Sequence, residues 1–562
     1  MKRFTLFITI LLPFLANAAK NEGDTFKFPA DRKLLTAEQL IERYYVDNVD
    51  ADKMVQDAIV AMLKTLDPHS TYSDPEETKE LTTPLEGNFS GIGIQFNMLN
   101  DTLFVIQTTS GGPSEKVGIL PGDRILSAGD SIISGVKSPN SRIIKILRGP
   151  KGSKVDLKVM RRGEKEPIDF SIVRDDIPIY SIDASYMADP QTGYIRISRF
   201  AEETDAEFRK AVAGLRKQGM KNLVVDVSDN GGGYLNAAHQ LASHFLKFDD
   251  VVVYTDAPKM GTTIYRVEKS GDLQDGKLVI LANQYSASAS EILAGAVQDN
   301  DRGLIVGRRT FGKGLVQRPF PFPDGSMIRL TVSKYYTPAG RCIQKPYEAG
   351  DEEEYRKDML HRYEAGEFSS EDSIQLPDSL RYSTIRNKRP VYGGGGIMPD
   401  LFVPIDTAGY SDYYRDLVAK GILNRFSITY VDNHRKHLGS LYPTEQKFID
   451  GFKVTDAMMS EVVAMGVADS VKFDQAGFDR SRLTMETIIK GIIGRDLFET
   501  STYFKVVNPV LNPIYREGML LINNDERYNR LLREGRATKM KHQSKLQDTD
   551  RQSAVICILK SQ

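Results

Sequence analysis

Residues 277–299 read KLVILANQYSASASEILAGAVQD, and the architecture of the middle of the chain is decided here. The first six residues predict a buried strand, and ASEILAGAVQD predicts a helix because its apolar residues recur at spacings of three and four. Serines 286, 288 and 290 lie between the two elements. Ser288 therefore stands at the entrance of the helix, above the carboxyl end of a strand.

The same alternation of strand and helix continues on both sides of this stretch. Strand-like runs at 193–200, 222–228 and 303–309 alternate with helix-like runs at 205–219 and 235–248. This alternation predicts a layered α/β domain, in which ligands bind at the carboxyl ends of the strands. We place it at residues 176–405 and interpret the charged, turn-rich residues at about 346–390 as an insertion.

The flanking regions have residue patterns that differ from those of this domain. Residues 85–175 contain short β-branched segments separated by glycines, which predicts a compact module rich in strands. Residues 19–84 and 406–535 have the apolar spacing of amphipathic helices. The polar residues 536–562 predict a disordered tail.

The first 18 residues resemble a secretory signal peptide. Lys2 and Arg3 precede an apolar run from Phe4 to Leu15, and Ala16-Asn17-Ala18 follows as a cleavage site. We therefore expect a periplasmic or secreted protein. No later apolar run is long enough to span a membrane, so stable membrane insertion is not expected.

The composition gives no support for a nucleic-acid partner or for a disulfide framework. The chain has 562 residues, and 74 Lys and Arg against 75 Asp and Glu give a net charge of −1. This balance gives no electrostatic reason to expect a nucleic acid. Cys342 and Cys557 are too few for a disulfide framework.

Two interpretations of Ser288 follow from the residues around it. Ser288 and Glu291 fit the S-x-x-E capping box, which stabilises a helix by about 1 kcal/mol and needs no catalysis. The same position also suits a nucleophile, which requires a base. Lys313 is a candidate base because glycines on both sides let the backbone pack closely and desolvate the amine. A solvated loop lysine is the alternative.

Two further motifs fit the nucleophile interpretation. Gln317 follows Lys313 by four residues, so its amide could orient the lysine in a helix-like turn but not across a fully extended strand. Asn230-Gly231-Gly232-Gly233 joins a strand to a helix, where glycine amides could form an oxyanion hole. The alternative for the glycines is a flexible turn.

Together these motifs resemble the C-terminal processing peptidases, or tail-specific proteases. SASASEILAGAVQD followed by GRRTFGKGLVQ matches the nucleophile and base motifs of that family. The resemblance implies a serine endopeptidase with Ser288 as nucleophile, Lys313 as base and Gln317 as its orienting partner, while Ser286 and Ser290 have structural roles. It assigns the oxyanion hole to these three positions: Gly232, Gly233 and Ala289.

The resemblance also identifies residues 85–175 as a PDZ domain. Its carboxylate-binding loop would lie in GNFSGIGIQF, where the peptide-binding positions are Gly91, Ile92, Gly93 and Ile94. A peptide would add to this module as an extra strand. The implied fold is multidomain α+β: a helical N-terminal region, a β-rich PDZ module, an α/β, crotonase-like peptidase core and a helical C-terminal region.

We therefore expect a protease that recognises the accessible C-termini of protein or peptide substrates and cleaves through an acyl-enzyme. No metal or organic cofactor is implied, and no particular oligomeric state is predicted. One alternative is a catalytically silent PDZ scaffold that only binds peptides. Another is a related enzyme that uses the oxyanion hole on a thioester, for which the PDZ module has no obvious role.

Overall fold

The computed structural model of the chain describes residues 29–535. The predicted signal peptide at 1–18 and the predicted disordered tail at 536–562 lie outside the described residues. Within residues 29–535, no helix is both long and apolar enough to cross a membrane.

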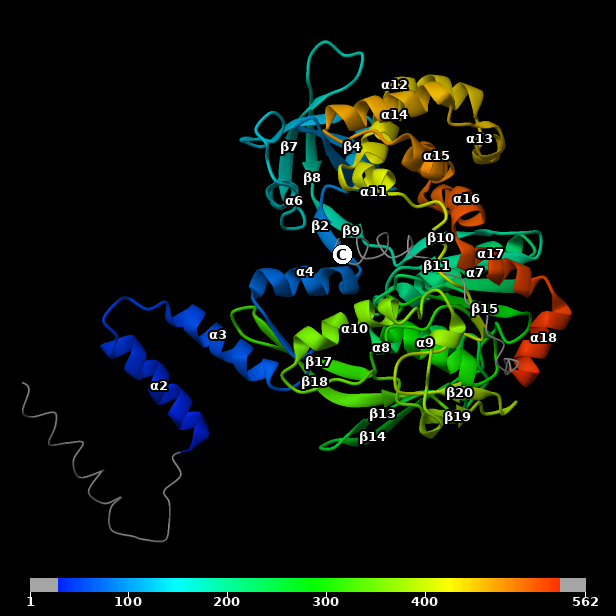
Figure 1. Cartoon of the computed structure of the whole chain (residues 1–562). Coiled ribbons are helices and arrows are strands. Elements are labelled where there is room, and N and C mark those ends of the chain that lie inside the picture. Colours follow the sequence, from blue (N-terminus) through cyan, green and yellow to red (C-terminus); the bar gives the residue numbers. More distant parts are fainter. Residues whose placement is uncertain (1–28, 536–562) are drawn as a thin grey trace, which may run out of the picture.

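The N-terminal region is helical, as expected. Its elements are α2 (Ala30–Tyr44), α3 (Ala51–Lys64), the short strand β1 (Thr71–Ser73) and α4 (Pro75–Glu86). Figure 1 shows α2 and α3, in blue, extending away from the rest of the molecule. Accordingly, α2 buries none of its side chains. Asp67-Pro68 ends the helical pair, and the chain then enters the body of the protein at β1.

The predicted PDZ module folds around a sheet with the order β3-β4-β5-β7-β8. Its elements are β2 (Asn88–Gly91), β3 (Ile94–Leu99), β4 (Thr102–Thr108), α5 (Pro113–Lys116), β5 (Arg124–Ala128), β6 (Ser131–Ile132), α6 (Asn140–Leu147), β7 (Lys154–Met160), β8 (Ile168–Val173) and β9 (Asp175–Pro178). Apolar side chains including Leu103, Ile125 and Val159 form its core. Because β3 lies at one end of the strand order, one of its edges has no partner in this sheet.

The predicted peptidase core is built on a six-stranded sheet of order β10-β11-β12-β15-β16-β21. Only the β10–β11 pair is antiparallel. The sheet and its helices comprise β10 (Ile182–Met187), β11 (Thr192–Ile197), α7 (Thr204–Lys217), β12 (Asn222–Asp226), α8 (Leu235–Ser243), β15 (Leu278–Ala282), α9 (Ala289–Asp299), β16 (Leu304–Gly307) and β21 (Leu401–Phe402). The predicted α/β alternation is therefore present.

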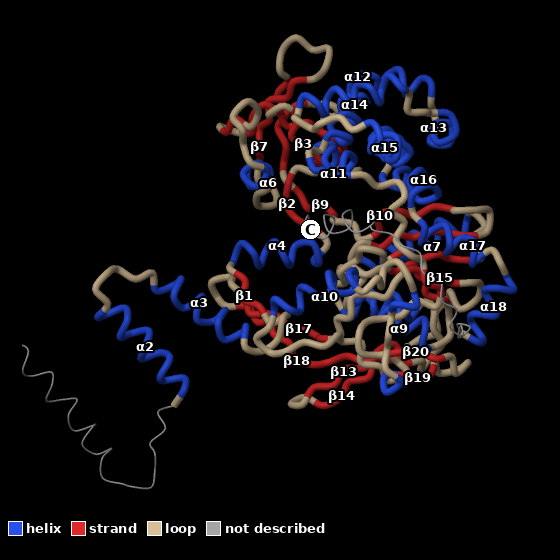
Figure 2. The backbone as a smooth tube through the Cα atoms, viewed as in Figure 1, coloured by secondary structure: helices blue, strands red, loops and turns tan. Residues whose placement is uncertain are grey.

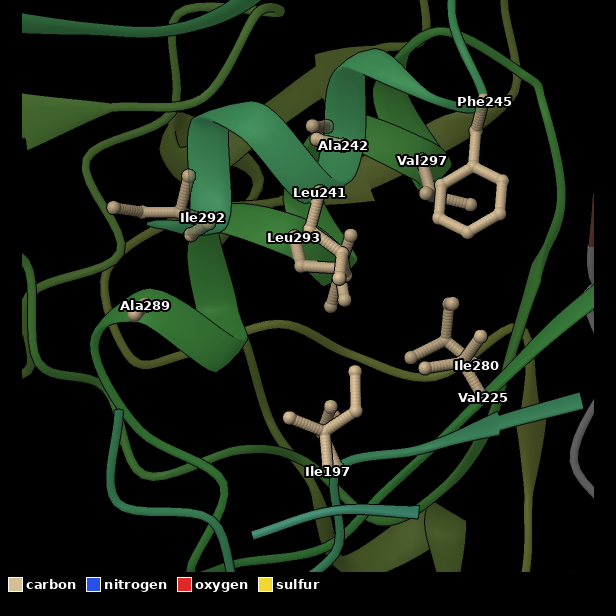
Figure 3. Packing of buried hydrophobic residues seen from close by; sticks show 14 of the residues in the cluster. Ile197, Val225, Leu241, Ala242, Phe245, Ile280, Ala289, Ile292, Leu293 and Val297 are labelled. Carbon is tan, nitrogen blue, oxygen red and sulfur yellow. The ribbon is translucent and has the colours of Figure 1, made fainter. Parts of the chain in front are cut away.

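Side chains alternate between the two faces of this sheet, as the period of a strand requires. On one face Ile197, Val225 and Ile280 pack under α8 and α9 (Figure 3). All of α9 is buried, including its polar residues. This burial fixes the start of α9, and with it Ser288, against the carboxyl end of β15.

A second sheet lies beside the first, with the order β1-β18-β13-β14 and with β17 also paired to β18 (Figure 2). Its remaining strands are β13 (Val251–Ala257), β14 (Gly261–Arg266), β17 (Leu315–Pro321) and β18 (Met327–Tyr336). The insertion adds α10 (Glu352–Glu364), the 3-10 turns η1 (Glu371–Ser373) and η2 (Asp378–Leu380), and the hairpin β19 (Arg381–Ser383) and β20 (Pro390–Tyr392). Since β1 pairs with β18, the N-terminal region completes this sheet.

The C-terminal region is helical as predicted, and its helices divide into two sets. They are α11 (Asp412–Ala419), α12 (Ile422–Leu441), α13 (Glu445–Gly451), α14 (Asp456–Ala468), α15 (Gln475–Leu497), α16 (Thr500–Leu511), α17 (Pro513–Ile522) and α18 (Asp525–Glu534). Helices α11–α15 share a core that includes Phe426, Val462 and Ile489. In contrast, Tyr515 and Tyr528 of α17 and α18 pack on the second face of the peptidase sheet.

Helix α12 also contacts the PDZ module. Ile428 packs with Phe104 and Ile106 of β4. Arg124 donates to Asp432 Oδ2 at 2.7 Å. The C-terminal helices therefore touch both the predicted PDZ module and the α/β core, and the four-part α+β architecture expected from the sequence is confirmed.

Candidate active site

The structure separates the three serines of the YSASASE motif. The Ser286 hydroxyl donates to Val227 O at 2.7 Å, and the Ser290 hydroxyl donates to Asn230 O at 2.8 Å. Both side chains are fully buried. Ser288 is half-buried, and among residues 29–535 its hydroxyl donates no hydrogen bond. Ser288 is therefore the serine whose proton remains available for chemistry.

The backbone at Ser288 adopts an unusual conformation. Its φ of 54° and ψ of −113° place a residue with a side chain in a region that normally suits glycine. Strain of this kind persists only where the surroundings impose it, and it is concentrated at functional sites. Here the imposing groups are the buried strand β15 and the buried helix α9 on either side.

Glu291 joins the Ser288 turn to the Lys313 loop. Its Oε2 accepts the backbone N–H of Ser288 at 2.8 Å and that of Lys313 at 2.9 Å. Its Oε1 accepts from Thr310 Oγ1 at 2.6 Å and from the Gly312 N–H at 2.7 Å. Burial raises the pKa of Glu291 to about 7, although these hydrogen bonds act in the opposite direction. The glutamate of the predicted capping box thus also fixes the loop that contains the lysine.

Tyr335 of β18 makes a second link between the same two segments. Its hydroxyl lies within hydrogen-bonding distance of Ser288 O, at 3.2 Å, and also of Lys313 O. The Tyr335 side chain is 1% exposed, so this link is made in the interior. The positions of Ser288 and Lys313 are therefore fixed by shared partners.

The glycines beside Lys313 permit the close packing that the sequence predicted. A Cβ at Gly312 would lie 3.1 Å from the backbone of Gly395, and one at Gly314 would lie 2.8 Å from Gln344 N. Burial, reinforced by the charge of Arg329, lowers the pKa of Lys313 to about 8. Among residues 29–535, Lys313 Nζ has no hydrogen-bond or ion-pair partner. An amine in this state can accept a proton near neutral pH.

Gln317 lies in β17, which resolves the choice between a helix-like turn and a strand. Its Nε2 donates to Leu315 O at 3.2 Å and to Thr331 Oγ1 at 3.3 Å. No hydrogen bond joins Gln317 to Lys313 within the described part of the chain. The register shifts between Val316 and Gln317, so the strand is interrupted by a bulge at this point and the helix-like turn is not formed.

The glycine loop lies directly against Ser288. A Cβ at Gly232 would lie 2.8 Å from Ser288 Cβ and 3.0 Å from Ala289 N. The Gly232 N–H, however, donates to Asn230 Oδ1 at 2.8 Å, so this amide already has a partner. The N–H groups of Gly233 and Ala289 form no hydrogen bond within residues 29–535. Of the three predicted oxyanion donors, these two remain unpaired.

The predicted carboxylate-binding loop connects β2 to β3. Ile92 is 2% exposed, and its carbonyl accepts hydrogen bonds from Ser114 N and Ser114 Oγ at 3.0 and 2.7 Å. Gly93 has a φ of +73°, and a Cβ there would lie 3.0 Å from Ile177 Cδ1. Arg148, just after α6, lies beside Gly91 with its Cγ 3.7 Å from the position of a Cβ. The loop therefore presents backbone groups near the free edge of β3, while the Arg148 guanidinium lies over the Phe89 ring, 4.2 Å from its centroid.

Several residues near the site were not singled out from the sequence. Thr331 accepts a hydrogen bond from Gln317 and donates one to Asp67. His69 lies near Lys313. Burial, followed by the charge of Lys313, lowers the pKa of His69 to about 3. His69 Nε2 lies 2.9 Å from the Tyr355 hydroxyl. The sequence signal that could have identified Asp67 and His69 is the stretch LDPHSTYSDP at residues 66–75. Apolar periodicity alone does not connect this stretch with Lys313 and Gln317, about 250 positions later.

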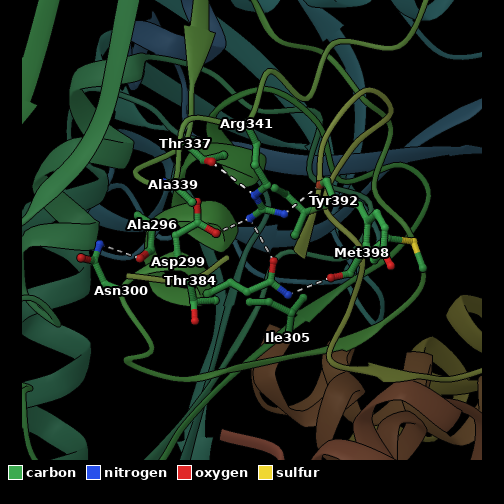
Figure 4. Close-up of polar contacts among 12 residues, drawn as sticks. Ala296, Asp299, Asn300, Ile305, Thr337, Ala339, Arg341, Thr384, Tyr392 and Met398 are labelled. Carbon is green, nitrogen blue, oxygen red and sulfur yellow. Dashed lines mark hydrogen bonds and ion pairs between the residues drawn. The ribbon is translucent and has the colours of Figure 1, made fainter. Parts of the chain in front are cut away.

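The far end of α9 is fixed by a buried ionic network (Figure 4). Arg341 donates to Asp299 Oδ1 at 2.5 Å and to Gln298 Oε1 at 3.0 Å, and the Arg341 and Asp299 side chains are fully buried. Removing one partner of such a pair leaves an uncompensated charge in the interior. The network therefore fixes α9 at the end opposite Ser288. Among the described residues, no cluster of His, Cys, Asp and Glu is arranged to bind a metal ion.

Four protein-family models match the chain. Peptidase family S41 matches residues 191–352, the PDZ domain residues 90–172, and the activating protease CtpB N-terminal domain residues 15–78. A family of unknown function, DUF8443, matches residues 413–499.

Curated relatives match more than half of the chain. The carboxy-terminal processing protease CtpB of Bacillus subtilis (strain 168) is 36% identical over 330 residues, which is 58% of this chain and 68% of the relative. The carboxy-terminal-processing protease of Bartonella bacilliformis is 34% identical over 349 residues, covering 60% of this chain and 78% of the relative. Among solved structures, the photosystem II D1 C-terminal processing protease matches at 29% identity and a TM-score of 0.32, over 56% of this chain and 91% of that one.

Proposed function

Since the chain belongs to the carboxy-terminal processing proteases, serine peptidases of family S41 with a PDZ domain, we propose that Ser288 is its nucleophile and Lys313 its general base. The observation that supports this assignment most is the shared acceptor Glu291 Oε2, which binds the backbone amides of both residues at 2.8 and 2.9 Å. The half-buried Ser288 hydroxyl and the Lys313 amine, whose pKa is lowered to about 8, are the complementary donor and acceptor.

The chemistry proceeds by acyl transfer. Ser288 Oγ attacks the scissile carbonyl while Lys313 Nζ takes the hydroxyl proton, which forms a tetrahedral oxyanion. The unpaired N–H groups of Gly233 and Ala289 stabilise this oxyanion. The oxyanion collapses, the C–N bond breaks, and Lys313 returns the proton to the leaving amine. A water molecule then hydrolyses the ester on Ser288 with Lys313 again acting as base.

Gln317 completes the site as the partner that orients Lys313. Both of its observed hydrogen bonds use Nε2, so its Oε1 remains free to accept a hydrogen bond from the lysine amine. Gly232 contributes by shape: any side chain there would overlap Ser288 Cβ. Its own N–H is a weaker candidate for the oxyanion hole because Asn230 already accepts it.

Substrate tails are recognised at the PDZ module. A peptide adds as a strand to the free edge of β3, and its terminal carboxylate meets the loop formed by Gly91, Ile92, Gly93 and Ile94. The substrates are therefore proteins or peptides with accessible C-termini. The signal-like residues 1–18 support export to the periplasm or beyond the cell.

The test is a cleavage assay on matched substrates. The purified full-length protein is incubated with an unfolded polypeptide that ends in a nonpolar tail, and fragments are identified by mass spectrometry. We expect internal cleavage by the wild type, none by Ser288→Ala, and slower cleavage when the substrate tail is amidated. Tail binding without cleavage by the wild type would instead identify a silent PDZ scaffold.

A further inference from the structure

The segment between α3 and β1 reaches into the peptidase site through Asp67. The Asp67 side chain is 8% exposed and accepts the N–H of His69 at 2.9 Å and the N–H of Ser70 at 3.1 Å. It also accepts the Ser70 hydroxyl at 2.5 Å. These bonds hold the carboxylate in one rotamer. Its Oδ1 additionally accepts the hydroxyl of Thr331 on β18 at 2.9 Å.

This contact sets the direction of a short chain of hydrogen bonds. A carboxylate can only accept, so the single hydroxyl proton of Thr331 is donated to Asp67. Thr331 Oγ1 must then act as acceptor toward any other partner. That partner is Gln317, whose Nε2 lies 3.3 Å from Thr331 Oγ1.

The direction of this series of hydrogen bonds determines which atom of the Gln317 amide faces away from Thr331. The amide nitrogen is occupied by Thr331 Oγ1 and by Leu315 O at 3.2 Å. The carbonyl Oε1 is therefore the free end. An amine such as Lys313 needs an acceptor, and a flipped amide would present it with two N–H donors instead.

We propose that Asp67 is a positioning residue, which acts through Thr331 to hold Gln317 with its carbonyl oxygen available to Lys313. This inference rests on the proposed role of Lys313 as general base. Asp67 lies outside residues 191–352, which match the S41 peptidase model, and outside the predicted core at 176–405. The N-terminal segment therefore completes the catalytic machinery of a domain whose predicted start, residue 176, lies about a hundred residues later.

The first test is Thr331→Val, which removes the hydroxyl with little change in shape and no change in charge. We expect the plateau of kcat against pH to fall about tenfold while KM for a short peptide stays unchanged, because only the orientation of the base is lost. The pH of half-maximal activity should not move. Thr331→Ser keeps the hydroxyl and should retain the wild-type plateau. Thr263→Val on the exposed part of β14 is the matched control.

The second test is Asp67→Ala, which removes the acceptor of the Thr331 hydroxyl and also removes a charge. The negative charge of Asp67 raises the pKa of Lys313. Its loss should therefore shift the acidic limb to lower pH, while the lost orientation lowers the plateau. An electrostatic role alone would shift the limb and leave the plateau intact.

The double variant Asp67→Ala/Thr331→Val separates a relay from two independent effects. If both residues act through the Gln317 amide, its plateau should equal that of the lower single variant, because the same orientation is lost once. A wild-type plateau in Thr331→Val, equal losses in Thr331→Val and Thr331→Ser, or multiplied losses in the double variant would overturn the proposal. An inactive wild type, or an active Ser288→Ala, would instead overturn the proposed function.

Discussion

The loop around Ser288 and the loop from Gly91 to Ile94 both follow short strands, but different groups hold them. In the Ser288 loop, a buried side chain does so: Glu291 accepts four hydrogen bonds that join two separate segments. In the PDZ loop, the backbone carbonyls of Ile92 and Gly93 accept hydrogen bonds from Ser114 and Thr109. Gly93 also has a positive φ. A side chain fixes the geometry in one region and the main chain fixes it in the other.

This difference predicts how each region responds to substitution. In the Ser288 loop, one side chain either performs the chemistry or positions a group that does, so single changes should act on kcat. In the PDZ loop, the groups offered to a peptide belong to the backbone and survive most substitutions. Changes there should act on the binding of tailed substrates. The comparison fails if both regions respond in the same way.

The largest effect on activity should distinguish Ser288 from Ser290 within the same loop. Ser288→Ala should lower kcat/KM about ten-thousandfold or more, because it removes the nucleophile. Ser290→Ala should keep most activity and lose about 1 kcal/mol of stability with its buried hydrogen bond. Peptidase kinetics and thermal melting measure the two effects. Comparable activity in Ser288→Ala and the wild type would remove the nucleophile assignment.

A smaller effect should follow from Glu291→Gln. The amide keeps the shape, but its NH₂ group would face backbone N–H donors that now bind Oε1 or Oε2. We expect kcat/KM to fall about a hundredfold, together with a lower melting temperature. Glu207→Ala is the control for lost stability, because it removes the acceptor of two backbone amides, those of Ser181 and Ile182, which both donate to Oε2.

The control distinguishes stability from positioning. Glu207→Ala should lower the melting temperature without a comparable loss of kcat. Equal loss of activity in Glu291→Gln and Glu207→Ala at matched stability would mean that Glu291 acts only as a structural acceptor. The contrast between the two loops would then lose its basis.

The smallest effect is expected in the PDZ loop. Gly93→Ala places a side chain at a φ of +73°, against Ile177, and should shift the backbone that meets the substrate carboxylate. KM for a long, tailed substrate should rise about fivefold, while kcat/KM for a short peptide stays unchanged. Amidating the tail should have the same effect on the wild type. Equal kinetics with free and amidated tails would exclude tail recognition at this loop.

Much of the fold could be predicted because its signals are local. The buried strand and helix around Ser288 follow from apolar spacing, and the glycines beside Lys313 from the need for close packing. The capping pattern of Ser288 and Glu291 was also visible. Periodicity could not show that Glu291 reaches Gly312 and Lys313, because that contact depends on how two distant loops meet.

Other features depend on contacts between distant segments or on competition for hydrogen bonds. Gln317 lies in a strand with a bulge, which a spacing of four residues does not distinguish from a turn. The Gly232 amide is taken by Asn230, two residues earlier. Helices α17 and α18 cover the peptidase sheet, although their amphipathic pattern resembles that of the helices before them. Such choices are made by tertiary packing.

The most direct test of the central claim is the pH dependence of kcat/KM for the wild type and Lys313→Arg. Lysine acts as base only when neutral, so activity should rise with pH through a single ionisation near the lowered pKa of about 8 and then reach a plateau. Lys313→Arg cannot lose its proton and should be as inactive as Lys313→Ala. An acidic limb near 6.5 that disappears in His69→Gln, or substantial activity in Lys313→Arg, would contradict the serine–lysine mechanism.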